Sequence, residues 1–184
     1  KYNVKLFSTN FALYGDMSQR VMNILSKLVS DIEIYSIDEA FLDMSEFKHE
    51  DIGSLCRIIR KKILQCTGIP VSIGVGRTKT LAKVANHMAK QFNQHKGVFI
   101  LSPDSEEYVL DKIPIEKVWG VGRKLQDFLK LYGINTAKQL RHSNLTWIKS
   151  KMTIVGEKMV KELRGESCYS IEYSSSDKKS ICTS

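Results

Sequence analysis

Two adjacent carboxylates, Asp38 and Glu39, lie between strand-forming apolar residues, where their mutual repulsion disfavours such a pair. Neighbouring side chains of a strand point to opposite faces, so the two can reach one cation only where the backbone bends, as at a hairpin turn. Residues 32–34 and 41–42 are mainly apolar and would supply the two arms. Carboxylate oxygens are the ligands that Mg²⁺ prefers while it also holds substrate phosphates. The pair therefore predicts a magnesium site at a hairpin tip, the alternative being a solvated acidic turn.

The elements that must position this pair follow from the periodicity of apolar residues. The pattern predicts a strand at residues 2–6 and then a helix at residues 10–28, which Asn10 can cap. A hairpin follows, with arms at residues 32–38 and 40–44. A second helix is predicted at residues 52–63 and a further strand at residues 71–75. The order strand, helix, strand, strand, helix, strand is that of the split βαβ, ferredoxin-like unit. The sequence therefore predicts an α+β fold in which the carboxylate hairpin belongs to a ferredoxin-like sheet.

Three lysines follow on the next predicted helix. Thr78 can cap a helix that turns its apolar residues inward and leaves Lys79, Lys83 and Lys90 on another side. A row of lysines is often only a solvated helix face. The alternative is a set of ammonium groups that contact phosphates.

A second region begins after a short strand at residues 98–101. Ser102 and Pro103 open a helix, with the cap followed by proline at the first position, and we place a domain boundary here. Residues 119–125 read WGVGRKL and resemble the turn of a helix-hairpin-helix. Gly120 and Gly122 let the backbone approach a phosphate, while the amides at the following helix start, near Arg123 and Lys124, point at it. Such a contact binds DNA without reading its sequence. Residues 155–166 are predicted to form a further helix of structural role.

Composition limits the classes of protein that are possible. The chain has 184 residues, 42% of them hydrophobic, and a formal net charge of +8, which favours a polyanionic partner such as nucleic acid. The four cysteines show no C-x-x-C spacing, so we predict neither a zinc site nor a disulfide framework. No apolar run is long enough to span a bilayer. A cytoplasmic protein without a membrane partner is expected.

Three separated blocks carry a resemblance to a known family. Residues 14–22 read YGDMSQRVM, residues 35–43 read YSIDEAFLD and residues 74–86 read GVGRTKTLAKVAN. Together they resemble the Y-family DNA polymerases, the enzymes of translesion synthesis, and look most like the UmuC-type (ImpB/MucB/SamB) branch. The resemblance covers nearly the whole chain.

The resemblance implies an activity and roles for particular residues. The complete protein would be a DNA-directed DNA polymerase of SOS-type repair that transfers a nucleotidyl group from a dNTP to a primer 3′-hydroxyl, using two Mg²⁺ ions. Asp38 would bridge both ions and Glu39 would hold the ion on the primer side. Lys90 would contact the triphosphate, with Lys79 and Lys83 as candidate DNA contacts. Primer–template DNA, a UmuD-like accessory protein, a recombinase filament and a sliding clamp would be the partners.

The resemblance also sets the expected domains. Residues 1–101 would form the polymerase palm, residues 102–168 an all-α helix-hairpin-helix thumb, and residues 169–184 a linker to a little-finger domain. The family's first metal-binding aspartate and its fingers domain do not appear in the sequence, so we expect a palm-plus-thumb fragment that is inactive by itself. The alternatives are a non-catalytic DNA-binding or regulatory relic of such a polymerase, or a nucleotidyl cyclase, against which the thumb-like hairpin argues.

Overall fold

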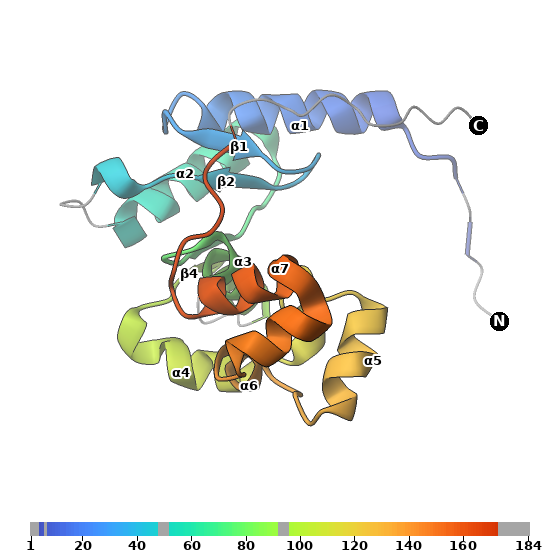
Figure 1. Cartoon of the computed structure of the whole chain (residues 1–184). Helices are drawn as coiled ribbons and strands as arrows, with labels where there is room; N and C mark the ends of the chain where they lie inside the picture. The colour runs from blue at the N-terminus through green and yellow to red at the C-terminus, as the bar shows by residue number, and fades with distance from the viewer. Residues whose placement is uncertain (1–3, 6, 48–51, 92–95, 173–184) are drawn as a thin grey trace.

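The structure of the protein is a computed structural model, and it describes residues 4–5, 7–47, 52–91 and 96–172 (Figure 1). Helices and short strands alternate up to residue 100, and the described elements after it are all helices. In chain order they are α1 (Phe11–Leu25), β1 (Ile32–Ile34), β2 (Ala40–Leu42), η1 (Ser45–Phe47), α2 (Ile52–Thr67), β3 (Ile73–Val75), α3 (Lys79–Gln91), β4 (Val98–Ile100), α4 (Pro103–Lys112), η3 (Ile115–Lys117), α5 (Arg123–Leu131), α6 (Ala137–Arg141) and α7 (Leu145–Leu163).

The predicted hairpin is present. β1 and β2 are antiparallel, with Glu33 opposite Phe41 and Ile34 opposite Ala40. The hairpin lies between α1 and α3 in Figure 1. Ile32, Ala40 and Leu42 pack on a core from α1 and α2 that includes Met22 and Ile59. Glu33 and Phe41, which alternate with these residues along the strands, are therefore turned toward α3.

β3, α3 and β4 form one parallel unit, in which β3 pairs with β4 and α3 connects them. Thr78 caps α3 as predicted, because its Oγ1 accepts the backbone N–H of Leu81 at 3.2 Å. A Cβ at Gly74 would lie 2.0 Å from the backbone nitrogen of Asn86. Only glycine at this position lets α3 approach the strand so closely, which explains one glycine of the GVGR segment.

The buried residues form two clusters. The smaller one joins α1, α2 and the hairpin. The larger one holds the apolar face of α3, including Leu81 and Val84, together with the helices that follow residue 102. Because α3 shares its core with those helices, the predicted palm and thumb regions are packed into each other on this side.

α7 ends the helical region and directs the chain back toward the hairpin. Thr153 has a positive φ of 63° and breaks the helix near its middle, so the predicted helix from residue 155 is the second half of α7. Just after the C-terminal end of α7, Gly165 has a φ of 89° and the Glu166 N–H donates to the Lys161 carbonyl. These two features make a Schellman motif. The strap, residues 166–172, then runs up to β1 (Figure 1).

The α+β class is confirmed. The ferredoxin-like sheet stays a prediction, because the described strands form two separate pairs, β1 with β2 and β3 with β4. Of the predicted strand at residues 2–6, residues 2, 3 and 6 lie outside the described residues, and residues 4 and 5 are not in a strand. The division at residue 101 also stays a prediction. Among the helices described, none is long and apolar enough to cross a membrane.

Candidate functional site

The tip of the hairpin is a tight turn that presents Asp38 to solvent. The backbone N–H groups of Tyr35 and Ser36 both donate to the Glu39 carbonyl at 3.0 Å, which closes the turn. The Ser36 hydroxyl donates to Asp38 Oδ1 at 2.8 Å. Ser36 therefore supports the turn, and Asp38 is exposed to solvent.

Glu39 is held by a lysine of α3. Lys83 Nζ lies 2.8 Å from both carboxylate oxygens of Glu39, and it also lies 5.4 Å from the centre of the Tyr35 ring. The Lys83 and Glu39 side chains are 23% and 29% exposed. A cation above an aromatic face is attracted by the ring quadrupole, so Lys83 has two favourable partners on the hairpin.

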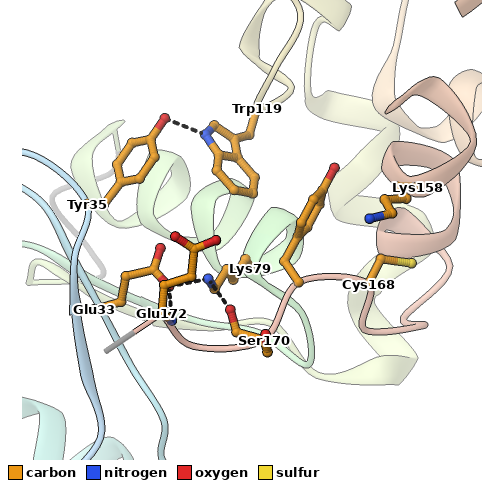
Figure 2. A pocket seen from close by; sticks show the side chains of 9 residues that line it. Glu33, Tyr35, Lys79, Trp119, Lys158, Cys168, Ser170 and Glu172 are labelled. Carbon is orange, nitrogen blue, oxygen red and sulfur yellow. Dashed lines mark hydrogen bonds and ion pairs between the residues drawn. The ribbon is translucent and has the colours of Figure 1, made fainter. Parts of the chain in front are cut away.

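One turn earlier on α3, Lys79 makes a more deeply buried set of contacts. Its ammonium pairs with Glu33 of β1, donates to the Ser170 carbonyl at 2.7 Å and lies 5.2 Å from the centre of the Phe41 ring. The Glu172 N–H of the strap donates to the same Glu33 carboxylate at 2.8 Å (Figure 2). Lys79 and Glu33 thus fasten three separate segments together.

Four aromatic rings gather beside these ion pairs. Trp119 of the predicted thumb hairpin lies 5.6 Å from Tyr35, 5.5 Å from Phe41 and 5.6 Å from Tyr169 between ring centres. Its Nε1–H donates to the Tyr35 hydroxyl at 3.1 Å, as Figure 2 shows. Burial, followed by the Glu162 carboxylate, raises the pKa of Tyr169. Three of the rings, those of Tyr35, Trp119 and Tyr169, line a pocket of about 400 Å³ together with Lys79, Lys158 and residues of the strap.

The two carboxylates suit a hard divalent cation, but they do not complete a site. Both are oxygen donors on adjacent turn residues, with Asp38 exposed and Glu39 half-buried. Asp43 is engaged elsewhere, because its Oδ1 accepts the Ser45 N–H at 2.8 Å at the start of η1. Within the described residues no group of three or more His, Cys, Asp or Glu side chains is placed to hold a metal. The metal assignment of Asp38 and Glu39 stays a prediction.

Lys90 lies farther along the same side of α3. It is seven residues, or about two helical turns, beyond Lys83, and its side chain is exposed. His87, one turn before it, has a lowered pKa, first because it is partly buried and then because Lys117 and Lys90 are near. This end of α3 is therefore electropositive, which is compatible with the predicted role of Lys90 toward a triphosphate.

The predicted phosphate-binding turn precedes α5. The Val121 N–H donates to the Val118 carbonyl at 3.0 Å, and Gly120 adopts a φ of 88° that favours glycine. Gly122 is the N-cap of α5, and Gly122, Arg123 and Lys124 are all exposed. Because Trp119 at the start of this turn contacts Tyr35, the turn is attached to the carboxylate hairpin near its tip.

Sequence reasoning missed the partners that surround the site. It gave no role to Glu33, Trp119 or Tyr169, and it named Lys79 and Lys83 as candidate DNA contacts, the alternative being a solvated helix face. The structure places both ammonium groups on hairpin carboxylates, and a DNA contact by either stays a prediction. One local signal pointed to Glu33: a carboxylate between Ile32 and Ile34 on a strand is buried on one side and needs a cation.

Comparison with known proteins gives a consistent set of relatives. Residues 1–87 match the model of the impB/mucB/samB family. The protein UmuC of Salmonella typhimurium is 43% identical over 184 residues, which span 98% of this chain and 44% of UmuC. The protein SamB of Salmonella typhimurium is 42% identical, with 97% of this chain and 43% of SamB covered. This chain therefore spans less than half the length of these relatives.

Solved structures agree with the sequence relatives. The crystal structure of a DinB family error-prone DNA polymerase from Sulfolobus solfataricus superposes with a TM-score of 0.77 at 26% identity. The match covers 91% of this chain and 50% of that polymerase. Both the hairpin region and the helices after residue 102 thus have counterparts in a single known protein.

Proposed function

This chain is a homologue of the UmuC-type proteins of the impB/mucB/samB family, and we propose that it forms the palm and thumb of a translesion DNA polymerase. The reaction would be transfer of a nucleotidyl group from a dNTP to a primer 3′-hydroxyl on a template strand. One observation carries the proposal: Asp38 and Glu39 occupy the tip of a hairpin that is supported on one side by α1 and α2 and on the other by α3.

In this proposal Asp38 and Glu39 are the ligands of divalent metal, and a third carboxylate comes from outside the described residues. Bound Mg²⁺, with two ions in the complete site, would neutralise charge on the phosphates and make the attacking hydroxyl more acidic. The exposed ammonium of Lys90 would offset charge on the departing pyrophosphate.

The turn before α5 would hold the backbone of the DNA. Gly122 and the first residues of α5, Arg123 and Lys124, are exposed, and amides at a helix start favour an anion. Such contacts are to phosphate and carry no sequence information. Primer–template DNA and dNTP are the proposed substrates. A UmuD-like protein, a recombinase filament and a sliding clamp are further partners proposed from the resemblance alone.

Primer extension by the longer protein that contains this chain tests the proposal. Asp38→Ala and Glu39→Ala should each reduce extension at least about a hundredfold, because removal of a metal ligand acts on the chemical step, while DNA affinity stays nearly unchanged. Asp104→Ala is a matched control, since Asp104 is an exposed carboxylate at the start of α4. It should extend primers like the wild type.

Retained extension by either hairpin variant would refute the metal assignment. If the longer protein binds primed DNA but does not extend it with Mg²⁺ and candidate accessory proteins, the non-catalytic DNA-binding alternative is favoured.

A further inference from the structure

On one face of the hairpin, acidic side chains alternate with aromatic rings. Each of the two acids on this face forms an ion pair with a lysine of α3. Glu33 and Tyr35 on the first arm, and Glu39 and Phe41 on the second, share this face because side chains two residues apart in a strand point the same way. Lys79 contacts Glu33 and Phe41, and Lys83, four residues later, contacts Glu39 and Tyr35. α3 therefore makes two successive ion pairs with the hairpin.

The two ion pairs differ in their surroundings. The Lys79 and Glu33 side chains are only 9% and 11% exposed, and both make further hydrogen bonds with the strap. The Lys83 and Glu39 side chains are 23% and 29% exposed. A buried pair costs several kcal/mol to break, whereas a pair open to water is easily exchanged. The buried pair of Lys79 and Glu33, the inner pair, is therefore fixed. The more exposed pair of Lys83 and Glu39, the outer pair, is exchangeable.

The outer pair covers the carboxylate that is proposed to bind metal. Both oxygens of Glu39 lie 2.8 Å from Lys83 Nζ, so a metal ion that binds Glu39 meets the ammonium at the same two oxygens and is repelled by its charge. Lys83 has another partner close by, because its Nζ lies 5.4 Å from the centre of the Tyr35 ring. Tyr35 is itself fixed by the Trp119 indole N–H.

We propose that Lys83 is a positioning residue that serves as the exchangeable counter-ion of Glu39, holding the carboxylate in place and yielding it to the metal ion. The inference rests on the proposed function, since it needs a divalent metal at Glu39. It differs from a role of Lys83 in DNA binding, because it predicts an effect on metal affinity in the absence of DNA.

Binding of Mn²⁺ to the 184-residue chain, followed by the electron paramagnetic resonance signal of free Mn²⁺, tests the exchange. Lys83→Gln removes the competing cation and should raise Mn²⁺ affinity about two- to fivefold, the range expected for a partly exposed ion pair. Lys83→Arg should lower it, because a guanidinium binds a carboxylate through two parallel hydrogen bonds. Lys62→Gln removes the same charge from the exposed side of α2 and should have little effect.

The outcomes separate this inference from the proposed function. If Glu39→Gln abolishes Mn²⁺ binding but Lys83→Gln leaves the affinity unchanged or lowers it, the exchange is refuted and the metal site stands. If none of the variants binds Mn²⁺ and circular dichroism shows all of them folded, both the exchange and the metal site are refuted in this chain.

Reactivity of the lysines gives a second, direct measurement. An amine-reactive reagent followed by mass spectrometry should label Lys83 several-fold more in the presence of Mg²⁺ than in its absence, because the ammonium is released from Glu39. Lys79 should stay protected under both conditions, and exposed Lys62 should be labelled equally in both. Protection of Lys83 that does not change with Mg²⁺ would contradict the exchange.

Discussion

Among single residues, Trp119 links the turn before α5 to both the hairpin and the strap. Its ring contacts Tyr35, Phe41 and Tyr169, and its indole N–H donates to the Tyr35 hydroxyl. The chain brings these four side chains from the hairpin, the turn before α5 and the strap. The tryptophan is thus the common contact of three segments around the proposed site.

Graded substitutions test this role. Tyr35→Phe removes one hydrogen bond and should cost about 1 kcal/mol of unfolding free energy. Trp119→Ala also removes the ring contacts and should cost about 3 kcal/mol. Urea unfolding measures both. The control is Trp147→Phe, since Trp147 stacks on Phe128 and phenylalanine keeps an aromatic ring there. Equal costs for Tyr35→Phe and Trp119→Ala would contradict the proposed role of the indole ring.

At the scale of elements, two buried glutamates fix the helices after residue 102 onto α3. Glu106 of α4 is 1% exposed and binds Arg77 at 2.9 Å and Arg141 at 2.9 Å. Glu162 of α7 accepts the Thr80 N–H at 3.0 Å near the start of α3. A carboxylate at a helix N-terminus is favoured by the helix dipole, so Glu162 caps α3 from a distant part of the chain.

The neighbouring acids Glu106 and Glu107 provide a matched comparison. Glu106→Gln leaves two arginines without their buried carboxylate and should lower the unfolding free energy by about 3–5 kcal/mol. Glu107 pairs with Arg141 and His142 at the surface, where its side chain is 46% exposed, and Glu107→Gln should cost at most about 1 kcal/mol. Chemical denaturation of the two variants measures the difference. Similar losses would show that the Glu106 network does not hold these helices.

The elements themselves could largely be predicted from the sequence, because their signals are local. Asn10 and Thr78 cap α1 and α3 as expected, and the Asp-Glu turn closes the hairpin. Contacts between distant segments could not be predicted in this way. Lys79 and Glu33 are 46 residues apart, and no helical or strand period links them. Periodicity also shows that Leu81 faces inward, but not that the core cluster it joins includes residues of α7.

At the scale of the whole molecule, the excess positive charge should govern binding to DNA. We expect the 184-residue chain to bind primed duplex DNA weakly and with strong salt dependence, because the proposed contacts are to phosphates. Fluorescence anisotropy at increasing salt measures the slope. The double variant Arg123→Gln/Lys124→Gln should reduce the magnitude of the slope of log affinity against log salt concentration by about 2. Lys62→Gln should leave this slope nearly unchanged. Affinity that does not vary with salt would contradict a phosphate-based interface.

The strap also makes β1 the meeting point of distant parts of the chain. The Glu172 N–H donates to the Glu33 carboxylate and the Ser170 carbonyl accepts from Lys79, so the end of the described chain is held at β1 and not at the end of α7. Glu33 and Glu172 are 139 residues apart, and the hydrogen bond between them closes a loop that takes in most of the described residues. Loss of the Glu33 carboxylate would therefore open this loop at β1 as well as remove the partner of Lys79.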